Sequence, residues 1–122
     1  MRRKFGILLS MLLLAGAVQS QSRYGEDSVK CVINLSLYRE YYKQKNYEDA
    51  IKPWRWVYNN CPSSSGNIFK NGPTIIKYLI KKTPENKAAY TDTLMMIYDK
   101  RIQYFGKEGY VLGKKGADLI KY

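Results

Sequence analysis

The sequence predicts an all-α fold built from antiparallel helix pairs that stack on one another. Apolar residues recur at steps of three and four along most of the chain beyond residue 28, which is the spacing of one face of an α-helix. Polar or proline-containing turns interrupt this pattern near residues 44–46, 62–67 and 83–84. With 122 residues, the chain has room for one small domain.

The N-terminus has the parts of a secretory signal peptide. A basic start at residues 2–4 precedes an apolar run of fourteen residues, Phe5 to Val18, and small residues then allow cleavage after Ala17 or Ser20. The run is too short to span a bilayer. A short buried helix is the alternative, but we predict a signal peptide over residues 1–20 and export to the periplasm or the outer envelope.

The first helix is predicted over residues 29–44. Residues 21–28 are polar and predict a flexible tail. From Val29 onward the helical face comprises Ile33, Leu37, Tyr38 and Tyr41.

The second helix has the clearest amphipathic pattern in the sequence. Asn46 is its predicted N-cap, with Asp49 as the acidic partner three residues later. Pro53 predicts a kinked or loosened first half, and Pro62 predicts an end before it. The apolar face comprises Tyr47, Ala50, Ile51, Trp54, Val57, Tyr58 and Cys61.

Three more helical segments follow a turn at residues 63–67. In the third, Gly72-Pro73 predicts either a bend or a helix restricted to the part after Pro73. Thr83 is the predicted N-cap of the fourth, with Pro84 at its first position and Gly106 as its C-cap after Phe105. The fifth segment covers residues 110–122 and has no predicted partner helix.

The stretch from Cys31 to Ser64 has the length of one tetratricopeptide repeat, 34 residues, and resembles that repeat. Three positions depart from the family pattern, namely Asn34, Tyr38 and Val57, and beyond Gly66 only helical period and length agree. The matching packing positions are Leu37, Tyr41, Tyr47, Ala50, Trp54 and Pro62.

The resemblance implies a right-handed solenoid of about two repeats plus one extra helix over residues 29–122. Repeats bury their apolar faces against neighbours, and about three are needed for a stable stack. The fifth segment therefore acts as a cap, pairs with another chain, or belongs to a longer array of which this chain is the front; we favour the last.

The resemblance also implies a peptide-binding groove lined by the first helix of each pair. Arginine, lysine and tyrosine in such a groove suit an acidic or carboxylate-bearing peptide, although a plain solvated face explains them too. The expected groove residues are Leu35, Arg39, Tyr42, Lys43 and Lys77.

The two cysteines, Cys31 and Cys61, lie at the start of the first helix and the end of the second. Antiparallel packing brings those ends together, and a disulfide there would contribute roughly 3 to 4 kcal/mol by loop entropy. Two buried free thiols are the alternative.

The excess of basic over acidic residues predicts a basic surface for the mature chain. Three of the 21 basic residues belong to the leader, so 18 remain against 10 acidic residues, a net charge of +8. Export and the scattered lysines argue against nucleic acid, and membrane association is expected to be peripheral at most.

The sequence predicts no catalytic or metal site and no cofactor. It contains no histidine, and the two cysteines do not have the spacing of a zinc site. We expect a non-enzymatic protein-binding or scaffold module of the cell envelope. The alternative is a peripheral protein whose basic surface binds anionic lipid or glycan.

Overall fold

The computed structural model describes residues 23–122, and this part of the chain is helical with no β-strand. The all-α prediction is thereby confirmed. The predicted leader and residues 21–22 of the predicted tail lie outside the described residues. The α-helices are α2 (Ser28–Lys43), α3 (Tyr47–Asn60), α4 (Asn67–Lys82), α5 (Lys87–Phe105) and α6 (Glu108–Lys121), with the short 3-10 helices η1 (Pro62–Ser64) and η2 (Pro84–Asn86) between them.

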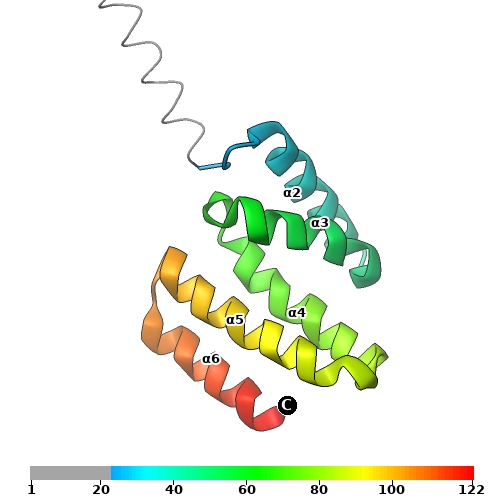
Figure 1. Cartoon of the computed structure of the whole chain (residues 1–122), viewed down its shortest axis with the longest axis vertical. Coiled ribbons are helices and arrows are strands. Elements are labelled where there is room, and N and C mark those ends of the chain that lie inside the picture. Colours follow the sequence, from blue (N-terminus) through cyan, green and yellow to red (C-terminus); the bar gives the residue numbers. More distant parts are fainter. Residues whose placement is uncertain (1–22) are drawn as a thin grey trace, which may run out of the picture.

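Each helix packs against the next one in the chain. Figure 1 shows them side by side in chain order, from α2 at one end of the molecule to α6 at the other. α6, at the red end of the chain, lies against α5.

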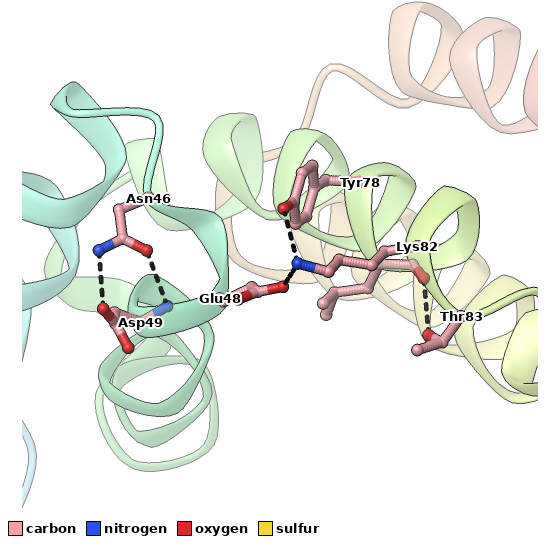
Figure 2. Close-up of polar contacts among 7 residues, drawn as sticks. Asn46, Glu48, Asp49, Tyr78, Lys82 and Thr83 are labelled. Carbon is pink, nitrogen blue, oxygen red and sulfur yellow. Dashed lines mark hydrogen bonds and ion pairs between the residues drawn. The ribbon is translucent and has the colours of Figure 1, made fainter.

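Side-chain caps start the first two helices. The carboxylate of Asp27 accepts the backbone N–H of Lys30 at 3.0 Å, so α2 begins at Ser28, one residue before the predicted start. Asn46 caps α3 as predicted. Its Oδ1 accepts the N–H of Asp49 at 3.4 Å, and its side-chain amide donates to the Asp49 carboxylate at 2.7 Å (Figure 2).

Two prolines lie within continuous helices. α3 runs through Pro53 and α4 runs through Pro73, so the alternative in which the third helix begins after Pro73 is wrong. Both proline rings are buried, and each removes one backbone hydrogen bond from its helix. α3 ends at Asn60, ahead of Pro62, as predicted.

Thr83 is the N-cap residue of η2, with Pro84 at the first position as predicted, but its side chain makes no capping hydrogen bond and it does not cap α5. Its hydroxyl donates to the carbonyl of Leu79 at 2.8 Å, which satisfies a C-terminal carbonyl of α4 instead (Figure 2). η2 then intervenes, and α5 begins only at Lys87. The predicted end of α5 is confirmed, because Gly106 caps it with φ +72°, a conformation that favours glycine.

The core is centred on Trp54. Its indole is fully buried, stacks on the ring of Tyr58 at 4.9 Å between centroids, and donates to the carbonyl of Ile68 at 2.8 Å. This hydrogen bond ties α3 to the first turn of α4. Ala50 is fully buried as well, and Tyr41 and Tyr47 are half-buried against the core.

The predicted face of α2 is wrong for its two aliphatic residues, whereas its tyrosines were placed correctly: Tyr38 is fully buried and Tyr41 packs against the core. Leu37 is 44% exposed and Ile33 is 53% exposed, whereas Leu35 is 6% exposed. The buried face comprises Cys31, Leu35 and Tyr38, whose spacing of four and three is also helical. Packing against α3 selects this face.

A disulfide joins Cys31 to Cys61, whose Cα atoms are 6.3 Å apart, and both residues are buried. The bond ties the start of α2 to the end of α3, so the two helices are antiparallel. Of the two alternatives from the sequence, the structure has the disulfide.

Candidate functional site

A polar cavity of about 440 Å³ opens among α4, α5 and α6, and we call it the basic cleft. Packing of α5 against α4 and of α6 against α5 brings the three helices to this cavity, and helical spacing selects the side chains that each one contributes. Lys70, Thr74 and Lys77 lie at i, i+4 and i+7 on α4, which places them on one face of that helix. The other lining residues are Phe69, Pro73, Tyr98, Arg101, Tyr110 and Lys114.

One carboxylate, that of Asp118, joins the three helices beside the cleft. It is 8% exposed, accepts a hydrogen bond from the Tyr98 hydroxyl, and lies 3.0 Å from the ammonium of Lys77. Burial raises the pKa of Tyr98 well above its usual value, and the hydrogen bond to Asp118 raises that pKa further. The ammonium of Lys77 is thus paired with a carboxylate of the same chain, and Tyr98 stays protonated at neutral pH.

The other three cations of the cleft have no carboxylate partner within residues 23–122. No ion pair or side-chain hydrogen bond of Lys70, Arg101 or Lys114 is formed with the described part of the chain. Two of them lie over the Tyr110 ring: its centroid is 5.7 Å from Cζ of Arg101 and 5.2 Å from Nζ of Lys114. Cation–π contacts of this kind hold a cation in place without cancelling its charge.

A second cavity of about 200 Å³ adjoins the basic cleft, and we call it the Phe105 pocket. It shares Lys70 and Arg101 with the cleft, so these two side chains lie at the junction. Its remaining lining residues are Gly66, Phe105, Gly106 and Lys107.

Of the groove residues predicted from the sequence, Lys77 lies in the basic cleft and Leu35 is a wrong prediction, because it is buried in the core. Arg39 donates to the Ser65 hydroxyl at 3.0 Å, and the Tyr42 ring packs against Tyr47 at 5.6 Å. These residues and Lys43 lie on α2 and do not line the cleft.

Sequence reasoning missed most of the cleft. A usable signal was present, since α4 carries four lysines and no acidic residue. Two of these lysines, Lys70 and Lys77, are seven residues apart and so share a helical face. Arg101 and Lys114 come from other helices, and nothing in their spacing connects them to α4.

A second polar cluster connects α3 to α4 and has a structural role. Figure 2 shows the Lys82 ammonium between the Glu48 carboxylate and the Tyr78 hydroxyl. The hydrogen bond to Glu48 raises the pKa of Lys82. The Tyr78 ring also packs against Tyr47 at 5.3 Å.

Residues 23–122 have neither a metal-binding cluster nor a membrane-spanning helix. No group of three or more His, Cys, Asp or Glu side chains in this range is arranged to bind a metal ion. Over the same range, no helix has the length and apolar character needed to cross a membrane.

The chain was also compared with known proteins. No protein-family model, no curated protein and no solved structure matches it.

Proposed function

We propose that this protein is a non-enzymatic interaction module of the cell envelope, exported by a signal peptide at residues 1–20. In this proposal its helices stack as tetratricopeptide-like repeats and bind a segment of a protein partner. The observation that supports it best is the set of three cations around one cavity that form no ion pair with residues 23–122, namely Lys70, Arg101 and Lys114.

Cations on three packed helices are suited to binding an anionic partner. Their backbone positions are held by the core, so binding orders only side chains, which lowers its entropic cost. Charge-assisted hydrogen bonds from lysine and arginine to carboxylates are among the strongest available to a protein. A peptide segment with acidic side chains is therefore the partner that the cleft suits best.

The second candidate is a peripheral protein that binds anionic lipid or glycan. The net charge of +8 over residues 23–122 favours it, as does exposed Lys81 at the end of α4. Such binding depends on the summed charge and falls steeply as salt rises. Binding in the cleft depends on particular side chains.

Photo-crosslinking in envelope extracts tests the first proposal. A benzophenone side chain replaces Thr74, which is exposed in the cleft, or Lys87, which is exposed at the start of α5. We expect a discrete protein adduct from position 74 and none from position 87. Identical adducts from both positions, or none from either, would make the proposal wrong.

Charge variants then identify the surface. Lys70→Glu/Arg101→Glu is expected to abolish the adduct, whereas the matched control Lys81→Glu/Lys87→Glu is expected to keep it. Arg39→Ala/Lys43→Ala tests whether the binding surface extends onto α2. If both glutamate pairs weaken binding to anionic vesicles equally and leave the protein adduct unchanged, the lipid or glycan alternative is favoured.

A further inference from the structure

We infer that the basic cleft and the Phe105 pocket form one site with two parts, which recognises an aromatic side chain flanked by carboxylates in a partner peptide. This inference rests on the proposed function, and it specifies the sequence that the partner presents.

The two cavities are adjacent and share two lining residues. Lys70 of α4 and Arg101 of α5 line both of them, so a ligand bound at these cations contacts both cavities. Tyr98, Arg101 and Phe105 lie at i, i+3 and i+7 on α5 and form one stripe that runs from the cleft into the pocket. The site therefore has a cationic part and an aromatic part at adjacent positions.

The Phe105 pocket suits an aromatic ring. Its volume of about 200 Å³ exceeds the roughly 150 Å³ of a cavity known to bind benzene. Phe105 is 42% exposed and packs against buried Phe69 at 5.6 Å, so an incoming ring would extend an existing aromatic cluster. Two walls are glycines, Gly66 and Gly106, which present backbone to the ligand and leave room for the ring.

The cations around the pocket also favour an aromatic ring over an aliphatic side chain. Lys70, Arg101 and Lys107 line it, and cations attract the negative face of an aromatic ring. The same cations attract carboxylates on either side of that ring. An acidic segment with an aromatic residue in its middle satisfies both requirements.

The position of Asp118 separates this ligand from a bilayer surface. Asp118 and Tyr98 are both buried and pair with each other, so the free cations beside them line a cavity of about 440 Å³ and not a flat face. A peptide side chain enters a recess of this size, whereas a flat lipid surface meets only its rim.

Four synthetic peptides test the inference by fluorescence anisotropy with the mature chain. The first contains two glutamates, a phenylalanine and two glutamates. The second has alanine in place of phenylalanine, the third has glutamines in place of the glutamates, and the fourth has both changes. We expect the first to bind at least about fivefold more tightly than the second and at least about tenfold more tightly than the third.

Protein variants assign the two parts of the site. Phe105→Leu keeps an apolar side chain. In this variant we expect the ratio of the affinities for the phenylalanine and alanine peptides to fall toward one. Lys70→Gln/Arg101→Gln is expected to weaken both acidic peptides about tenfold or more, and the control Lys81→Gln/Lys87→Gln to change neither beyond about twofold. Because the peptide substitutions use the unchanged protein, they remain decisive if a variant fails to fold.

Three results would overturn the inference. Equal binding of the phenylalanine and alanine peptides would show that the site does not recognise an aromatic side chain. If Phe105→Leu still preferred the phenylalanine peptide to the same extent, the aromatic side chain would bind outside the Phe105 pocket. Complete displacement of the first peptide by an equimolar amount of inorganic phosphate would indicate a site for small anions. If no peptide binds but the cleft still crosslinks to a partner, the sequence preference is wrong and the proposed function stands; if both fail, both are wrong.

Discussion

The backbone of Gly72 lies directly against the indole of Trp54. A β-carbon built at Gly72 would lie 2.5 Å from Cζ2 of Trp54, closer than real β-carbons approach a neighbour. Trp54 cannot move away easily, because its indole N–H is bonded to the Ile68 carbonyl and its ring is stacked on Tyr58. This contact determines how closely α4 packs on α3.

Gly72→Ala is therefore expected to lower the free energy of unfolding by about 1 to 3 kcal/mol, since the added methyl group overpacks the core. Urea denaturation measures the change. Gly113→Ala is the matched control, because nothing lies within 4 Å of a β-carbon at Gly113 in α6. Alanine favours the helix there, so we expect an unchanged or slightly increased free energy of unfolding. Equal effects of the two variants would show that the Gly72 contact is unimportant.

Leu35 and Leu37 form a matched pair on α2. Leu35→Ala is expected to cost about 2 to 5 kcal/mol of unfolding free energy, because Leu35 is buried against α3. Leu37→Ala is expected to cost less than about 1 kcal/mol, because Leu37 is largely exposed. Thermal or urea unfolding of the two variants measures the difference. A larger cost for Leu37 would show that the opposite face of α2 is buried.

Reduction of the Cys31–Cys61 disulfide is expected to lower the free energy of unfolding by about 3 to 4 kcal/mol, from the loop closed by residues 30 apart in sequence. The measurement is urea denaturation with and without a thiol reductant. Cys31→Ala/Cys61→Ala is the control and should show no response to reductant. An intact mass that does not change on reduction would mean that no disulfide forms.

Stability is expected to fall as the pH rises above about 10. Burial raises the pKa values of Tyr38, Tyr58 and Tyr98 above the ordinary value of 10.0. Between the unfolded and folded pKa values, the unfolded chain has lost protons that the folded protein retains, so raising the pH favours unfolding. Burial also lowers the pKa of Lys100 below 10.5. Just below that pH, Lys100 therefore makes a smaller contribution of the opposite sign, in which stability rises with pH.

Tyr98→Phe isolates one of these groups. The variant lacks the hydroxyl that donates to Asp118, so we expect a lower stability at neutral pH and a shallower loss of stability between about pH 10 and pH 11. Thermal unfolding across this range measures both. An alkaline slope identical to that of the parent protein would show that Tyr98 does not contribute to it.

The features that the sequence determined by itself are local. Asn46 and Gly106 set the start of α3 and the end of α5, and Pro62 stops α3, because each acts on backbone groups within one turn of its own position. Thr83 shows the limit of this reasoning. Its hydroxyl can accept from a backbone N–H of the following turn or donate to a carbonyl at the end of α4, and in the structure it donates to the Leu79 carbonyl.

Only the tertiary structure decided which faces of the helices are buried and where the candidate site lies. On α2, the residues around Leu35 and those around Leu37 both have helical spacing, and contact with α3 chose between them. Lys70, Arg101 and Lys114 come from three helices, so their convergence depends on helix packing. Packing is set by contacts between residues far apart in sequence, such as Gly72 with Trp54, and the local spacing of residues does not predict these contacts.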